Sequence, residues 1–187
     1  MAPDVIATAA HCLAGENITA LRFVFGYSMR DPVTPKLVIP NRDIYQARAV
    51  IAWQLDNKTG SDWALIRLDR PVTNHRIARI RQAGTIRNGQ AVHAIGYPLG
   101  LPAKLAPGTV QSNTASSFFR SDIPSYPGNS GSPVFHSTTH ALEGIILGGN
   151  GQRLVRQGDC VVTRATASVA TRASAFATAL PTLRSNP

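Results

Sequence analysis

The sequence predicts an all-β fold, a barrel or a sandwich, with one helical segment near its C-terminal end. Short runs rich in β-forming residues recur along the 187 residues, and turns that contain glycine or proline separate them. One stretch departs from this pattern, the alanine-rich residues 171–180, which favour a helix. The chain is long enough for one large domain or for two small barrels that share an interface.

Four strands are expected in the first half of the chain, at residues 5–8, 21–27, 45–53 and 63–68. Residues 30–40 contain three prolines and predict a loop with an edge strand. Residues 56–60 predict a turn. Asp62 comes just before the fourth strand, so we expect it on a loop that this strand holds in place.

The second half follows a polar connection, residues 72–89, that shows no strong periodicity. Beyond it we expect six more strands, at residues 90–97, 108–111, 117–120, 133–136, 141–147 and 159–163. Residues 98–102 predict a turn, because they contain two prolines and a glycine. Thr171 precedes the alanine-rich stretch, and its hydroxyl suits the N-cap of the expected helix.

The composition narrows the classes of function. The formal net charge is +9, but the basic residues form no run and no motif that combines them with aromatic residues, so we expect a cationic surface and no nucleic-acid partner. No apolar stretch is long enough to span a membrane, and no membrane partner is expected. The two cysteines, Cys12 and Cys160, show no metal-ligand spacing, so we expect neither a metal nor a cofactor.

Residues 126–135 contain a serine within a run of small, turn-forming residues, Tyr-Pro-Gly-Asn-Ser-Gly-Ser-Pro-Val-Phe. Gly128 and Gly131 lack a Cβ, so the backbone around Ser130 has access to conformations that other residues resist. Such a turn can aim backbone N–H groups at one point, as an oxyanion hole requires. Taken alone, the stretch also fits an ordinary loop between two strands.

Two further motifs precede this loop. Thr-Ala-Ala-His-Cys places His11 near the start of the chain, and Ser-Asp-Trp-Ala-Leu-Ile-Arg-Leu places Asp62 before an apolar run. A serine hydroxyl becomes a good nucleophile when a histidine takes its proton and a carboxylate orients that histidine. Asp56 and Asp69 are alternatives to Asp62. Asp56 lies in an expected turn and Asp69 is followed by Arg-Pro, so we expect both to be surface charges.

With these three motifs, the chain resembles the trypsin-like (chymotrypsin-fold) serine peptidases, and most of all the bacterial branch that includes the glutamyl endopeptidases. Gly-Tyr-Pro-Leu-Gly-Leu-Pro-Ala-Lys at residues 96–104 also resembles that branch. The resemblance implies two six-stranded antiparallel Greek-key barrels, the first incomplete, with a C-terminal helix. Residues 1–88 would form the first barrel and residues 89–187 the second. It also implies a secreted or periplasmic serine endopeptidase that acts on proteins or peptides, and we expect a monomer.

The resemblance assigns roles to the site residues. His11, Asp62 and Ser130 would be catalytic, and the N–H groups of Gly128 and Ser130 would form the oxyanion hole. The residues expected to bind the substrate are Ser125 at the pocket floor, with Ile146, Leu147, Gly148 and Gly149 along one wall. Ile146 stands about where glutamyl endopeptidases carry a histidine, so we expect a small or apolar residue, rather than glutamate, before the scissile bond.

Two expectations concern completeness. The family places two strands before the one that leads to the histidine motif, and only ten residues precede His11 here, so we expect a chain that starts inside the domain. The usual partner of a cysteine at Cys12 would then lie upstream or be absent, and no bridge to Cys160 is expected. The alternative function is a truncated or inactive homologue that acts as a binding protein.

Overall fold

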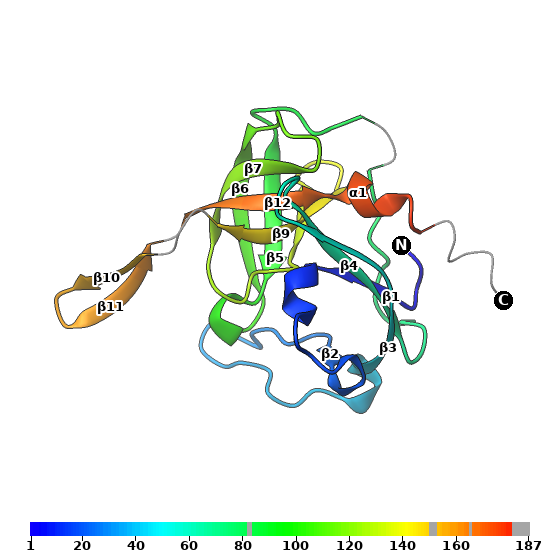
Figure 1. The fold of residues 1–187 in the computed structure, drawn as a ribbon. Coiled ribbons are helices and arrows are strands. Elements are labelled where there is room, and N and C mark those ends of the chain that lie inside the picture. The colour runs from blue at the N-terminus through cyan, green and yellow to red at the C-terminus, as the bar shows by residue number, and fades with distance from the viewer. Residues whose placement is uncertain (82–83, 150–152, 165, 181–187) are drawn as a thin grey trace.

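A computed structural model describes the whole chain except residues 82–83, 150–152, 165 and 181–187. Its strands form an open four-stranded sheet, a closed six-stranded barrel and a separate two-stranded hairpin (Figure 1). The all-β fold with one complete and one incomplete barrel is therefore confirmed. Sequence reasoning missed two strands. One of them, β10, belongs to the hairpin, and the other, β12, belongs to the closed barrel.

The open sheet contains the first four strands in the order β1-β4-β3-β2, and all its pairings are antiparallel. These strands are β1 (Val5–Thr8), β2 (Arg22–Val24), β3 (Ile44–Asp56) and β4 (Ser61–Leu68). Seven of the eight residues of β4 are buried, as its apolar run predicts, because β1 and β3 cover its two edges. Asp62 is the second residue of β4 and pairs with Leu55, so its expected place on a loop is wrong.

The closed barrel has the strand order β12-β7-β6-β5-β8-β9. Its strands are β5 (Ala91–Gly96), β6 (Lys104–Ser112), β7 (Phe118–Ser125), β8 (Pro133–His136), β9 (Leu142–Gly149) and β12 (Thr166–Arg172). The helix was expected over residues 171–180, so its first two residues lie in β12, and no element was expected at residues 166–170. Residues 166–172 form a strand because β7 and β9 pair with both of their edges, and this pairing overrides a weak local preference.

The remaining elements are short. Four 3₁₀ turns lie between the strands, at η1 (Ala10–Leu13), η2 (Ile18–Ala20), η3 (Asn41–Asp43) and η4 (Pro98–Gly100). The hairpin of β10 (Arg153–Gln157) and β11 (Cys160–Arg164) extends away from the barrel (Figure 1). The helix α1 (Ala173–Ala177) is shorter than expected and has Arg172, not Thr171, at its N-cap.

Two hydrophobic cores hold these parts together. One fills the barrel and includes Val92, Phe119 and Ile146. The other lies where the open sheet, β9 and α1 meet, and there the Trp63 ring lies 6.1 Å from that of Phe176. This second core joins the two halves of the chain, so residues from both halves can meet at one site.

An apolar cavity of about 540 Å³ lies between the four-stranded sheet and the barrel strands β8 and β9. Residues of β1 and β2 line it, and in the described chain neither strand pairs along its outer edge. The structure thus agrees with the expectation of an open first barrel. Unpaired edges of this kind favour association with other strands unless something covers them.

Candidate active site

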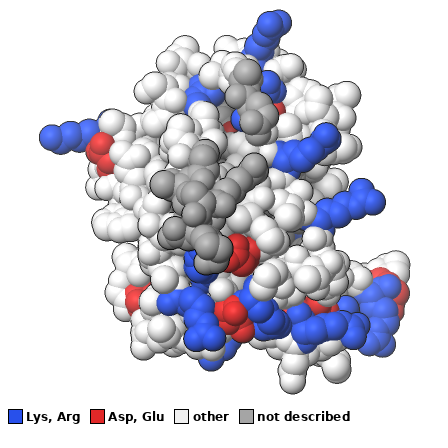
Figure 2. Space-filling view, turned by 90° about the vertical axis from the view of Figure 1, so that its right-hand side faces the viewer, with Lys and Arg blue, Asp and Glu red and all other residues white. Residues whose placement is uncertain are grey.

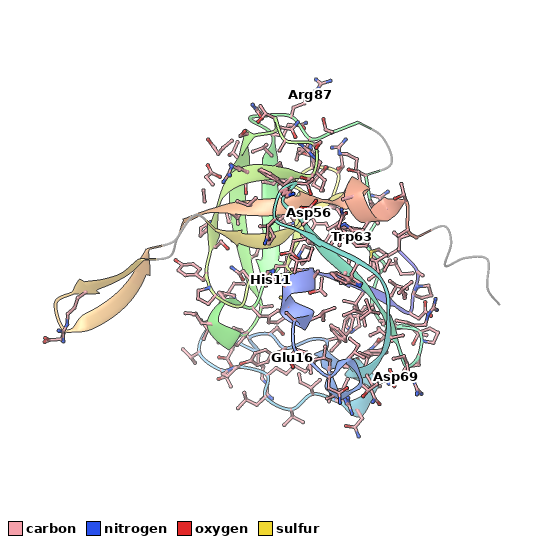
Figure 3. The ribbon with its side chains drawn as sticks, viewed as in Figure 1. His11, Glu16, Asp56, Trp63, Asp69 and Arg87 are labelled. Carbon is pink, nitrogen blue, oxygen red and sulfur yellow. The ribbon has the colours of Figure 1, made fainter. Side chains whose placement is uncertain are left out.

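His11 and Asp62 form a close pair. Figure 3 shows His11 between the barrel and the open sheet. The turn η1 follows β1 and carries His11, while β4 pairs with β1 and brings Asp62 alongside. The Nδ1 of His11 lies 2.5 Å from the Oδ2 of Asp62, and the backbone N–H of His11 donates to Oδ1 at 3.1 Å. Both carboxylate oxygens therefore engage one residue, which orients the imidazole and leaves its Nε2 facing outward.

Thr171 holds Asp62 from the side of the barrel. Its side chain is fully buried in β12. The Asp62 N–H donates to the Thr171 hydroxyl at 3.3 Å, and that hydroxyl donates to the Asp62 carbonyl at 3.1 Å. Sequence reasoning missed this role, because the two residues are 109 positions apart and no local pattern connects them.

Ser130 lies on a tight loop between β7 and β8. Gly128 and Gly131 both adopt left-handed backbone conformations, with φ of 86° and 83°. The Gly131 N–H donates to the Ile146 carbonyl at 2.7 Å, and the Ile146 N–H donates to the Ser132 carbonyl at 2.8 Å. Two short bonds to β9 thus fix the loop just after Ser130.

The N–H groups of the loop divide into two sets. Those of Asn129, Gly131 and Ser132 donate to backbone carbonyls. Those of Gly128 and Ser130 donate to no carbonyl of the described residues. Two free donors beside a serine hydroxyl can stabilise an oxygen that gains negative charge. They are the two donors that were expected from the sequence.

The thiol of Cys12 lies between His11 and Ser130. Its Sγ is 3.6 Å from the Nε2 of His11, and the Ser130 hydroxyl is a further polar neighbour of the thiol. Within the described chain no hydrogen bond joins His11 directly to Ser130. Burial raises the pKa of the Cys12 thiol, and the charge of Asp62 raises it further, although the Ser130 hydroxyl opposes the change. Cys12 is a free thiol, as expected.

The alternative carboxylates are engaged elsewhere. Asp56 accepts hydrogen bonds from Lys58 N–H at 2.8 Å and from the Thr59 hydroxyl at 2.9 Å, within its own turn. Asp69 accepts from Gln46 N–H at 3.0 Å and pairs with Arg70 at 2.8 Å. In Figure 3, Asp69 lies at the end of the open sheet that is far from His11. Of the three acidic residues, Asp62 alone contacts His11 in the described structure.

The residues expected to bind the substrate lie on β7 and β9. Ser125 ends β7 and is buried, and the Ile146 side chain is fully buried in the barrel core. Ile146 therefore shapes the site through its two backbone hydrogen bonds to the serine loop. Leu147, Gly148 and Gly149 are partly exposed at the end of β9, and the space that a side chain at Gly148 would occupy is empty. Their contact with a substrate stays a prediction.

Figure 2 shows lysine and arginine side chains spread over one face, and along its lower edge they lie beside acidic ones. Among the described residues, no three His, Cys, Asp or Glu side chains cluster in a way that could hold a metal ion. No helix in the described part of the chain is long and apolar enough to cross a membrane.

Comparison with protein families identifies the group to which this arrangement belongs. The profile of the trypsin-like peptidase domain matches residues 1–145. The chain belongs to this family. The match contains the three motifs around His11, Asp62 and Ser130. Because the members of this family are peptidases, the substrates of the family are proteins or peptides. No curated protein matches the chain significantly.

Solved structures with the same fold include three structures of two peptidases. A Glu endopeptidase in complex with MPD is 18% identical, with a TM-score of 0.67, and the match covers 100% of this chain and 83% of that one. The active form of the Rv3671c protease from M. tuberculosis is 16% identical, with a TM-score of 0.63, over 100% of this chain and 72% of that one. An inactive form of Rv3671c, a serine-to-alanine mutant, is 15% identical, with a TM-score of 0.60, over 100% and 80%. At these identities the likeness supports the fold.

Proposed function

We propose that this chain is a serine endopeptidase that cleaves peptide bonds through an acyl-enzyme. The observation that supports it most is the 2.5 Å contact between His11 and Asp62, with two unused N–H donors beside Ser130. The three side chains supply a nucleophile, a base and an orienting carboxylate, which is the set that activates a serine hydroxyl.

In the first half of the reaction, the Oγ of Ser130 attacks the substrate carbonyl carbon and gives its proton to the Nε2 of His11. The carbonyl oxygen gains negative charge and accepts hydrogen bonds from the N–H groups of Gly128 and Ser130. Asp62 stabilises the imidazolium through Nδ1. His11 then donates the proton to the departing amine, the C–N bond breaks, and an ester to Ser130 remains.

In the second half, water replaces the amine. His11 takes a proton from the water, the resulting hydroxide attacks the ester carbonyl, and the same two N–H groups bind the oxyanion. The ester bond breaks, the proton returns to Ser130, and the carboxylic acid product leaves. No cofactor takes part in either half.

Direct proton transfer requires the Cys12 thiol to leave its place. Its Sγ now contacts the Nε2 of His11, so a rotation about χ1 has to release this nitrogen before it accepts the proton of Ser130. Such rotations of partly exposed side chains are fast compared with turnover. If the thiol stayed in place, the alternative function would apply, an inactive homologue that binds peptides without cleaving them.

Kinetics of the single and double variants test this proposal. Ser130→Ala and His11→Ala should each abolish hydrolysis of a protein substrate, and the double variant should be scarcely worse, because residues that act as a unit give non-additive losses. Circular dichroism checks that each variant folds. Additive losses, or full activity in either folded variant, would contradict the proposal. A secreted or periplasmic location, a monomeric state, the boundary at residues 88/89 and the lack of a nucleic-acid partner stay predictions.

A further inference from the structure

Five exposed apolar side chains gather along β5, η4 and the start of β6. They are Ile95, Tyr97, Leu99, Leu101 and Leu105, with exposed fractions between 37% and 67%. Ile95 and Leu105 are direct cross-strand partners, so they share one face of the barrel. We call these five residues the apolar shelf. Contiguous exposed apolar surface on a soluble protein often marks a binding site.

The apolar shelf contacts the loop that carries Ser130. The Leu99 N–H donates to the Pro127 carbonyl at 2.7 Å. A β-carbon at Gly128 would lie 2.9 Å from the Tyr97 carbonyl oxygen and 3.1 Å from the Leu99 nitrogen. The backbones of η4 and of the expected oxyanion loop therefore touch. A ligand bound at Ser130 therefore has η4 as its neighbour on the Gly128 side of the loop.

Leu99 occupies a strained backbone conformation. Its φ is 56° and its ψ 24°, a left-handed region that a branched apolar residue enters only at a cost in free energy. Burial of the side chain does not offset this strain, since Leu99 is 57% exposed. Glycine or asparagine would adopt this conformation more easily. Leu99 thus offers an exposed apolar side chain to a ligand, next to the loop that carries Ser130.

The first half of the chain extends the apolar shelf. The Tyr27 ring stacks on that of Tyr97, with centroids 6.2 Å apart and planes 10° apart. The Ala103 N–H donates to the Tyr27 carbonyl at 3.1 Å and fastens the loop after β2 to the barrel. Aromatic side chains bind apolar groups over a large area and lose little conformational freedom.

We propose that the apolar shelf binds an apolar or aromatic side chain of the substrate on the leaving-group side of the scissile bond. This inference rests on the proposed function. The Ser130 loop lies between two structures, β9, bonded to Gly131, and η4, in contact with Gly128. Since the expected pocket for the acyl side is built from β9, the η4 side is left for the residues that depart with the amine.

The test compares two quenched-fluorescent peptides and a chromogenic amide. The peptides share their acyl side and differ after the scissile bond, with a Leu-Phe pair in one and an Asn-Ser pair in the other. The amide has no amino-acid residue after the scissile bond and carries only its chromophoric amine there. Wild-type protein should cleave the Leu-Phe peptide with a kcat/KM about tenfold higher, a typical discrimination by an apolar contact.

The variant Leu99→Asn removes the apolar side chain and suits the left-handed conformation, so it should not unfold the protein. It should reduce the preference to about twofold, and it should slow cleavage of the Leu-Phe peptide several times more than that of the amide. The matched control is Val33→Asn, at a side chain that is 85% exposed on another loop, and it should keep the wild-type preference.

The outcomes separate the two proposals. Cleavage of the amide without a preference between the peptides, or a preference that survives Leu99→Asn, would overturn this inference and leave the proposed function standing. Failure of wild-type protein to cleave all three substrates would overturn the proposed function and the inference with it. Self-association in sedimentation runs that Leu99→Asn abolishes would assign the apolar shelf to contacts between copies, and would also overturn the inference.

Discussion

Replacing Thr171 by valine tests how the barrel positions Asp62. The substitution exchanges a hydroxyl for a methyl group of similar size, so the packing in β12 is kept. What it removes are the two hydrogen bonds of 3.3 and 3.1 Å to the backbone N–H and carbonyl of Asp62. Thr171 is fully buried and Asp62 is 7% exposed, so water reaches neither group easily.

The expected magnitude follows from these contacts. A buried polar group that loses its partner costs about 1–3 kcal/mol, so we expect Thr171→Val to lose about 2 kcal/mol of unfolding free energy. For a chain of this size, that lowers Tm by roughly 4–8 °C. If Asp62 shifts and the imidazole follows it, kcat should fall about tenfold while KM changes little, since misplacement acts on the chemical step.

The control is Thr171→Ser, which keeps the hydroxyl and loses one methyl group, at a cost of about 1 kcal/mol. Thermal unfolding and steady-state kinetics on one peptide would be measured for all three proteins. The reasoning requires that serine preserves kcat and valine does not. Equal kcat values for the two variants would show that the hydroxyl of Thr171 does not position Asp62 for catalysis.

Three more predictions follow from the site and its surroundings. Iodoacetamide should inactivate the protein slowly near pH 7 and faster toward pH 9 and above, because burial raises the pKa of the Cys12 thiol, and Cys12→Ala should resist it. Gly128→Ala should lower kcat about 100- to 1,000-fold, since its β-carbon would press on the Tyr97 carbonyl and displace an oxyanion donor. Burial, and then the charge of His140, lower the pKa of His93 below its ordinary value of 6.5, so the unfolded chain binds a proton at this histidine at a higher pH than the folded chain does. The free energy of unfolding should therefore fall as the pH drops below about 6.5. In His93→Gln this fall should be smaller.

Local patterns in the sequence predict much of the fold. The alternation and turn residues predict most strands of the barrel, and the β8 segment is predicted at its observed bounds, Pro133–His136. These strands carry their own β-forming side chains and are bounded by proline and glycine, so little depends on distant contacts. The serine loop is recognisable for the same reason, because its glycines and proline are required by its backbone shape.

What the sequence does not reveal depends on contacts between distant residues. Asp62 belongs to β4 because β3 extends as far as Asp56, and its residue Leu55 pairs with Asp62. The short apolar run after Asp62 gives no indication of this pairing. Thr171 lies in an alanine-rich stretch that favours a helix, but it forms part of a strand because β7 and β9 pair with it on both sides. The place of the Cys12 thiol between His11 and Ser130 depends on how three segments meet, and no spacing encodes it.

Labelling with a serine-reactive fluorophosphonate tests the central claim most directly. The probe reacts with a serine hydroxyl that a base has activated, so it reports the assembled site without any knowledge of the substrate. We predict one label on the 187-residue chain, located on Ser130 by mass spectrometry and lost in His11→Ala. No label on folded protein, or a label on another serine that survives His11→Ala, would contradict the assignment of Ser130 as the nucleophile and favour a binding protein without activity.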